Sequence, residues 1–406
     1  MAEGTARPDG GSEDDKTIGR AAAIIRRSHG WSQQLVADRA GISKSYLSRL
    51  EAGKRAIDSR SLIVALARAL EVSPTELTQV ALPGISEDGL APVVDAVRIA
   101  LLGAGMGAPV GEIVPPEVLR TRVAALLDDQ QACRHEAVGA SLPRLIGDLH
   151  ATIAAGRDGV ELAQLAVLLH VQGAMAWLRD VGGPLDLGWQ AASIAQREAQ
   201  RVDAAPLLGI AAFGTGHGLL AAGAFDLAAQ QLATATAAVP TADVAGQQLV
   251  GMLTFTSSLV AAARRERSEA AAALDVASEL AARTGEANAW WFGFGPTNVG
   301  VWRMSVALES GEHPAAARIA EALDPRMIPS PQRQAAYWAD YGRALTRMRG
   351  RIADASAALR QAERISPHRL RHPFMRETLA ELRSKAPAGM VGREIRGMAH
   401  RAGLPG

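Results

Sequence analysis

The sequence predicts an all-α protein, and three observations support this fold class. About a fifth of the 406 residues are alanine, the best helix former. Apolar residues recur at helical spacing between glycines and prolines, whereas the alternating β-branched runs typical of strands are almost absent. Hydrophobic residues make up 48% and charged residues 21% of the chain, which favours a folded globular protein over a disordered one. At about 100–200 residues per domain, the length allows about two to four domains.

The cysteine count and the first residues argue against several classes of protein. The lone Cys133 can build neither a disulfide framework nor a cysteine zinc site, so we expect a cytoplasmic protein. Residues 1–15 carry five acidic residues, one basic residue and no apolar core, which predicts a disordered acidic tail rather than a signal peptide. We also expect no membrane span, because we expect every stretch of about 20 apolar residues to contain a charged residue.

No catalytic constellation can be assembled from the spacing of the reactive side chains. The nearest histidine pair, His368 and His372, is flanked by arginines and has no acidic or cysteine partner close by, which argues against a metal site. No Ser-His-Asp set and no pair of carboxylates stands out. We therefore expect no enzyme, no cofactor and no metal.

Positive charge is concentrated near the N-terminus, although the whole chain has a net charge of only +1. Residues 16–80 contain 11 basic and five acidic residues. Such a concentration on a small domain is typical of a protein that binds a polyanion.

Five short helices are predicted within this basic segment, over residues 17–28, 33–40, 44–52, 59–70 and 74–80. Ser32, Ser43 and Ser73 stand where helix caps are expected, and Gly41 turns the chain between the second and third helices. A helix, a glycine-containing turn and a second helix are the signature of a helix-turn-helix.

The run SQQLVADRAGISKSYLSRLEAGKR, residues 32–55, resembles the Cro and phage-repressor (XRE-type) family of DNA-binding domains, and the likeness extends over residues 17–80. The resemblance implies a five-helix fold like that of lambda repressor. In that family the third helix enters the major groove with its N-terminal half against the base edges. It also implies a structural ion pair between Arg26 and Glu51, which joins the first helix to the third.

The resemblance implies a role for each DNA-binding residue. Lys44 and Ser45 fall at the first base-reading positions, and Ser48 and Arg49 follow one turn later. Arg49 suits a bidentate contact with guanine, and Gln33 with the free amides of the second helix would hold a phosphate. The whole implied set is Gln33, Ser43, Lys44, Ser45, Ser48, Arg49, Lys54 and Arg55. For any one of Lys44, Arg55 and Arg60, a solvated surface charge is the alternative.

A weak repeat follows a predicted linker at residues 81–92. Five positions, each followed by small or apolar residues at +3, +7 and +10, recur at spacings of about 40 residues; they are Leu185, Phe225, Arg267, His313 and Ile352. The pattern resembles the tetratricopeptide (TPR) repeat with a longer unit. It implies a TPR-like α-solenoid over residues 93–385, whose concave face could bind a ligand. Residues 386–406 are expected to be a basic tail or a capping helix.

One aromatic segment departs from the alanine-rich background. Trp290, Trp291, Phe294 and Asn298 lie where a helix is interrupted by glycine and proline. They form our candidate ligand pocket on the concave face. The alternative is that this segment fills a gap in an otherwise thin core.

The layout of a repressor-type head followed by TPR-like hairpins resembles signal-sensing bacterial transcription regulators. It implies a cytoplasmic homodimer that binds an inverted-repeat operator in double-stranded DNA and senses a small molecule or a peptide. One alternative is a TPR scaffold that its basic head tethers to DNA. A toxin–antitoxin or phage-derived repressor is a third interpretation, against which the long second domain argues.

Overall fold

The computed structural model describes residues 17–79, 90–156 and 159–404, and in these residues the regular structure is helical apart from one isolated bridge between Ala287 and Phe294. The expected acidic tail at residues 1–15 lies outside the described residues, as do residues 81–89 of the expected linker. We call residues 17–79 the head and residues 90–404 the body.

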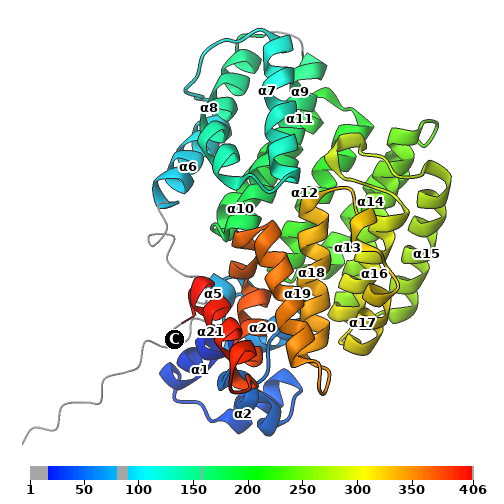
Figure 1. Cartoon of the computed structure of the whole chain (residues 1–406). Helices are drawn as coiled ribbons and strands as arrows, with labels where there is room; N and C mark the ends of the chain where they lie inside the picture. Colours follow the sequence, from blue (N-terminus) through cyan, green and yellow to red (C-terminus); the bar gives the residue numbers. More distant parts are fainter. Residues whose placement is uncertain (1–16, 80–89, 157–158, 405–406) are drawn as a thin grey trace, which may run out of the picture.

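The head contains the five helices expected from the sequence and lies at the lower end of the molecule in Figure 1. The hydroxyl groups of Ser32, Ser43 and Ser73, the expected caps, each accept a hydrogen bond from the backbone N–H three residues further on. Gly41 adopts a left-handed conformation with φ of 67°, which lets the chain turn sharply between the second and third helices. The head helices are α1 (Ile18–Ser28), α2 (Gln33–Ala40), α3 (Lys44–Glu51), α4 (Arg60–Leu70) and α5 (Pro74–Gln79).

The body is a succession of helices joined by short turns. A π-helical turn (Leu169–Met175) joins two of them, and short 3-10 helices occur at Ala289–Trp291, Pro325–Met327 and Pro367–Arg371. The α-helices are α6 (Ala91–Gly105), α7 (Pro116–Gln131), α8 (His135–Ala154), α9 (Gly159–Leu168), α10 (Ala176–Val181), α11 (Leu185–Val202), α12 (Ala205–Ala222), α13 (Phe225–Ala238), α14 (Val244–Ala263), α15 (Arg267–Thr284), α16 (Pro296–Glu309), α17 (His313–Glu321), α18 (Pro331–Thr346), α19 (Ile352–Ile365), α20 (Pro373–Ser384) and α21 (Met390–Arg401).

The repeat pattern corresponds to helix starts. Each of its five leading residues is the first residue of a helix, namely of α11, α13, α15, α17 and α19. In α15 the repeat positions Ala270, Leu274 and Ala277 are all buried, because residues three and four apart share one helix face. Consecutive helices pack as hairpins in the pairs α12–α13, α14–α15, α16–α17 and α18–α19.

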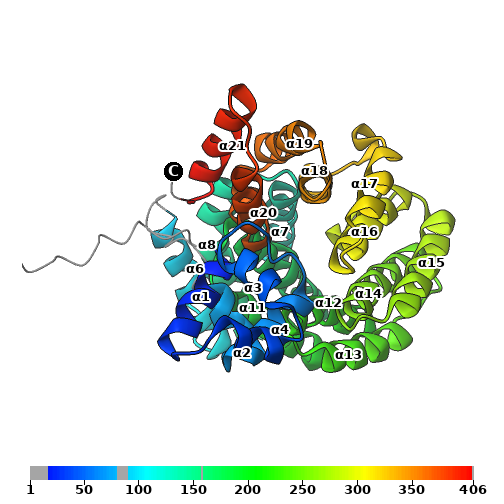
Figure 2. The ribbon, with the colours of Figure 1, turned by 90° about the horizontal axis from the view of Figure 1, so that it is seen from below.

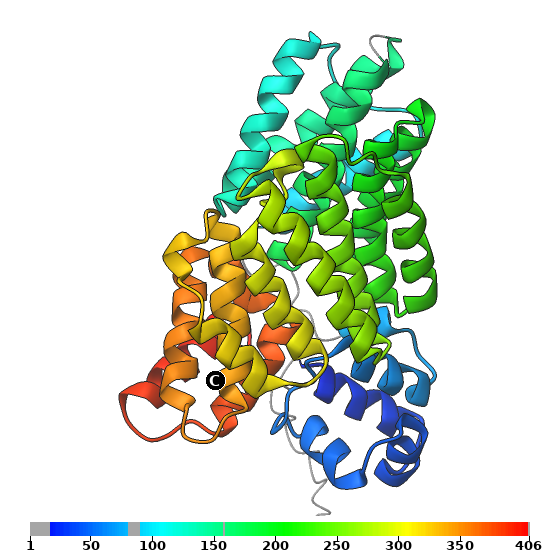
Figure 3. The ribbon, with the colours of Figure 1, turned by 90° about the vertical axis from the view of Figure 1, so that its right-hand side faces the viewer.

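The hairpins follow a curve when the molecule is seen from below, and the head lies against the open side of that curve (Figure 2). Figure 3 shows the stacked hairpins from the side, with the head and the C-terminal helices at the same end of the molecule. There α21 packs on α19 and α20 and buries Ile395 and Met398.

Glycines allow the close helix packing that the small residues of the sequence suggest. A Cβ atom on Gly342 of α18 would lie 2.5 Å from a methyl carbon of Leu359 in α19. A Cβ atom on Gly251 of α14 would lie 2.1 Å from the ring of Phe294. The aromatic segment therefore packs directly on the backbone of α14.

The structure corrects our expectation about charge-free apolar stretches. The helix α12 and the segment Gly159–Val181 are both long and apolar enough to cross a membrane by length and composition. The helix α12 contains no Asp, Glu, Lys or Arg at all. Within the body, 61% of the α12 window and 67% of the other are buried, as in core helices.

We predict that Gly251→Ala lowers the free energy of unfolding by about 1–3 kcal/mol, because the added methyl group overpacks the contact with Phe294. Gly188→Ala is the control, since its Cβ atom would meet nothing closer than 3.9 Å, and alanine there should be neutral or stabilise α11 by about 0.5–1 kcal/mol. Urea denaturation of both variants measures the difference. Equal stabilities would contradict the packing described here.

Candidate nucleic-acid interface

The helix α3 presents a polar face to solvent. Lys44, Ser45, Ser48 and Arg49 are exposed, whereas Leu47 and Leu50 on the opposite face are fully buried in the head. The guanidinium carbon of Arg49 lies 5.8 Å from the centre of the Tyr46 ring, a cation–π geometry that orients the side chain. The expected base-reading side chains therefore lie together on one accessible surface.

The other residues implied by the resemblance occupy more varied positions. Ser43 is exposed, and its Oγ accepts a hydrogen bond from the Tyr46 N–H at 3.2 Å, so it caps α3. Lys54 is exposed beyond the end of α3. Arg55 is partly buried, and its guanidinium lies 3.9 Å from the carboxylate of Glu381 in the body.

A buried ion pair fixes α3 beneath this surface. The Arg26 guanidinium donates two hydrogen bonds to the Glu51 carboxylate, at 2.6 and 2.8 Å, and the two side chains are only 12% and 6% exposed. This hydrogen-bonded pairing raises the pKa of Arg26. Gln33 donates from Nε2 to the same carboxylate at 2.8 Å, so the structure gives its amide a role in joining α2 to α3. A phosphate contact by Gln33 stays a prediction.

Two buried carboxylates of α20 hold the head against the body, and no local pattern in the sequence predicts them. The Glu377 carboxylate accepts hydrogen bonds from the backbone N–H groups of Ile18 and Gly19, the first two residues of α1, and from that of Ile57. Glu381 accepts from the N–H of Ala56 at 2.8 Å. Glu377 thus satisfies donors that the start of a helix leaves free.

Polar side-chain contacts extend this interface to three further body helices. The Asp58 carboxylate of the head forms an ion pair with Arg347 at 2.9 Å and lies 2.9 Å from Nε2 of His313, within hydrogen-bond distance. Arg60, the first residue of α4, pairs with Glu309 of α16 at 2.9 Å. The head is therefore held by polar groups from α16, α17, α18 and α20. We call this set of contacts the polar clamp.

The candidate ligand residues of the aromatic segment have packing roles in the structure. The indole N–H of Trp290 donates to the carbonyl of Ala245, and that of Trp291 donates to Asp128. Phe294 is fully buried, and Asn298 donates to the carbonyl of Gly293 at 2.9 Å. The four side chains do not line the cavity between head and body that is described below. A ligand-binding role for them stays a prediction.

The buried Arg26–Glu51 ion pair, a glycine turn and an exposed polar face on the third helix define the head as a DNA-binding module of the helix-turn-helix class. The sequence model of the family described as "Helix-turn-helix domain" matches residues 17–80. The chain therefore carries an N-terminal helix-turn-helix DNA-binding domain. Comparison with curated proteins and with solved structures gives no match.

We predict that Arg26→Ala destabilises the head by about 3–5 kcal/mol, because it leaves the buried Glu51 carboxylate without its cation. Arg39→Ala is the matched control, since Arg39 pairs with Glu71 at the surface, where the side chains are 39% and 61% exposed. Its loss should cost about 1 kcal/mol or less. Chemical denaturation measures both, and similar losses would refute a structural role for the buried pair.

We predict a pH dependence that arises from Glu377. Burial outweighs the three backbone hydrogen bonds and raises the pKa of Glu377 from its ordinary 4.5 to about 7. A carboxyl with a raised pKa in the folded state contributes stability below the unfolded pKa and loses it as the pH rises through about 7. At 1.36 kcal/mol per pKa unit, the raised pKa corresponds to a loss of about 3 kcal/mol in the free energy of unfolding once Glu377 is fully ionised.

The variant Glu377→Gln, which cannot ionise, is the comparison. Its stability should fall less than that of the original protein between pH 5 and pH 8, whatever its stability at pH 5. Parallel curves of unfolding free energy against pH would contradict this assignment.

Proposed function

We propose that the protein is a sequence-specific DNA-binding transcription regulator. The observation that carries the proposal is the exposed face of α3, where Lys44, Ser45, Ser48 and Arg49 stand together on a rigidly supported helix. A helix of this kind reads base edges in the major groove, and arginine is the side chain best suited to guanine. The proposal assigns the protein to the cytoplasm, with no catalytic role.

We further infer that the body is a TPR-like solenoid that senses a small-molecule or peptide signal. The regular start of a helix at each repeat position supports this interpretation, as does the curved row of hairpins. The polar clamp between head and body would connect the two functions. A signal bound in the body can alter DNA binding only by as much as its affinity differs between two arrangements of the head.

We also infer a homodimer, because an inverted-repeat operator presents two half-sites about one helical turn, or ~34 Å, apart. An exposed apolar surface on α6 and the segment after it offers a candidate contact. Its side chains are 45–88% exposed and are Ile99, Leu102, Met106, Val110 and Ile113. Apolar surface of this kind often marks an interaction site.

The test of DNA recognition is selection of genomic fragments by the purified protein at near-physiological salt. We expect a shared inverted repeat, and we expect Arg49→Ala to weaken binding to it by about 1–3 kcal/mol because a base contact is lost. Arg68→Ala, which removes an exposed arginine from α4, is the control and should select the same repeat.

A different outcome would favour the scaffold alternative. Fragments without a shared motif, bound equally by Arg49→Ala and released by modest salt, would show that the head makes only electrostatic contacts with DNA. The body would then be a protein-interaction module that the head tethers to DNA.

We predict that Met106→Asp shifts the protein from dimer to monomer in sedimentation velocity, because it places a charge in the proposed apolar contact. Met106 is 79% exposed, so the substitution should leave folding intact. Met327→Asp, at a site 66% exposed on another part of the body, should not change the oligomeric state. A dimer that persists in Met106→Asp places the interface elsewhere.

A further inference from the structure

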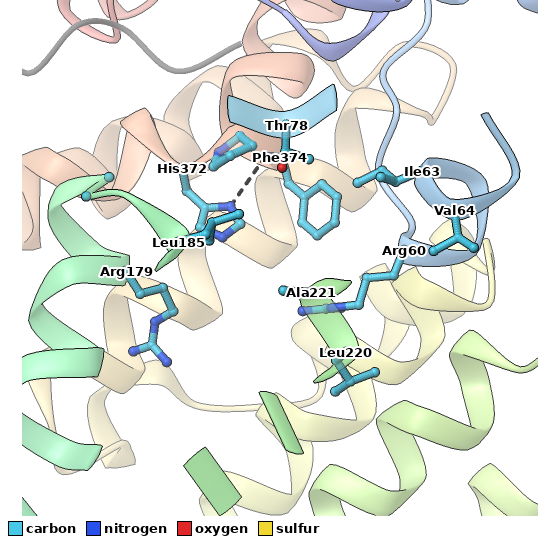
Figure 4. A pocket seen from close by; sticks show the side chains of 13 residues that line it. Arg60, Ile63, Val64, Thr78, Arg179, Leu185, Leu220, Ala221, His372 and Phe374 are labelled. Atoms are coloured by element: carbon cyan, nitrogen blue, oxygen red, sulfur yellow. Dashed lines mark hydrogen bonds between the residues drawn. The ribbon is translucent and has the colours of Figure 1, made fainter. Parts of the chain in front are cut away.

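A cavity lies between the head and the body, and it has two adjoining compartments. Both are lined by Arg60 of the head and by Arg179, His372 and Phe374 of the body. The larger compartment has a volume of about 180 Å³ and the smaller about 120 Å³. Figure 4 shows the smaller compartment, in which Arg60 and Arg179 reach toward the space from opposite sides.

The larger compartment carries more positive than negative charge. Five arginines line it, against the two carboxylates of Glu309 and Asp340, and these arginines are Arg60, Arg179, Arg333, Arg343 and Arg369.

Ion pairs within the protein account for only part of this charge. Glu309 pairs with Arg60, and Asp340 pairs with Arg343. Arg179 and Arg369 share one neighbouring carboxylate, that of Asp180, at 3.2 and 3.7 Å.

Arg333 is the arginine that remains unbalanced. Its one hydrogen bond goes to the backbone carbonyl of Phe292 at 3.1 Å, and no carboxylate of the described residues forms an ion pair with it. Burial, together with repulsion from Arg179 and Arg369, lowers the pKa of Arg333 to about 10. Arg333 is partly buried and has no ion-pair partner, although Asp180 attracts it from a distance. A cation in such a position is stabilised when an anion joins it.

Polar groups without a hydrogen-bond partner line the same compartment. Among the described residues, Trp302 Nε1, Arg343 Nε and His217 Nε2 are buried and lack a hydrogen-bond partner. Trp302 is only 7% exposed and Arg343 only 10%. Burial and the nearby arginines lower the pKa of His217 to about 3, which keeps its ring neutral. Such groups are normally paired, so the free N–H groups of Trp302 and Arg343 can receive acceptor atoms of a ligand.

The smaller compartment is mainly apolar. Ile63 and Val64 of the head face Leu185, Leu220 and Ala221 of the body across it. A ligand that fills both compartments therefore needs a charged end and an apolar end.

We propose that this cavity binds a small organic anion, a carboxylate or a phosphate monoester that carries a short apolar chain. The anionic group lies against Arg333, Arg343 and the indole N–H of Trp302, where charge-assisted hydrogen bonds are strongest. The apolar chain extends toward Ile63 and Val64 in the smaller compartment.

Such a ligand touches the head and the body at once. It therefore favours the arrangement in which the head is docked, because it binds that arrangement better than one with the head released. This effect on DNA binding rests on the function proposed above, whereas the anion site itself does not.

The test is calorimetric titration of the full chain with hexyl phosphate and with hexanoate. Hexanol and inorganic phosphate are the matched probes that lack the charge or the chain. We expect at least one of the two amphiphilic anions to bind, and to bind better than hexanol and inorganic phosphate. The tighter of the two identifies the anionic group as phosphate or carboxylate.

Variants locate the site. We expect Arg333→Gln to weaken binding of the anion about tenfold or more, equivalent to ~1.4 kcal/mol. Trp302→Phe, which keeps an aromatic ring but removes the unpaired N–H, should also weaken it. Arg326→Gln, on an arginine whose side chain is 88% exposed elsewhere on the body, should bind normally. Thermal unfolding of each variant shows that it is folded.

Several outcomes would overturn the proposal. These are the absence of binding by both anions, equal binding of hexanol, equal binding of inorganic phosphate, or unchanged binding in folded Arg333→Gln. The titration contains no DNA, so its failure is distinct from a failure of the regulator hypothesis. Operator affinity that stays unchanged at saturating anion would refute the coupling between cavity and head.

Discussion

The carboxylates of Glu377 and Glu381 are the contact on which the arrangement of the whole molecule depends. Both side chains are at most 1% exposed, and they accept hydrogen bonds from backbone N–H groups at the start of α1 and in the turn between α3 and α4. A buried carboxylate is costly unless it is hydrogen-bonded, and buried N–H groups are costly unless they are accepted. The body therefore supplies acceptors and the head supplies N–H donors, and these hydrogen bonds hold the head in one orientation.

That orientation has two consequences for function. The polar face of α3 stays open to solvent, because α20 contacts the head through the N-terminal end of α1 and the turn after α3 and leaves the base-reading side chains free. The same docking forms one wall of the cavity, since Arg60, the first residue of α4, lines it. The interface between head and body thus links the exposed face of α3 to the cavity that the arginines of the body line.

Local features of the sequence predicted much of the fold. Serine caps and the glycine at position 41 place the head helices to within one residue, and the repeat positions begin body helices. The clamp and the cavity could not be predicted, because Glu377, Asp58 and Arg60 meet their partners across long sequence separations without a local pattern. The packing of the aromatic segment has a physical reason, and its role in ligand binding stays a prediction. In a core made mostly of alanine, rings such as Phe294 are needed to fill the space beside glycines such as Gly251.

The distance along the chain between the two halves of the clamp has a consequence for synthesis. Ile18 and Glu377 are 359 positions apart, so a ribosome adding about 5–20 residues per second makes Ile18 roughly 20–70 s before Glu377. During that interval the nascent chain presents α3 without the support of α20. A polypeptide released early, before residue 373, would keep every base-reading side chain and lose the part of the protein that orients them. Translation must therefore reach α20 before the head acquires its final position.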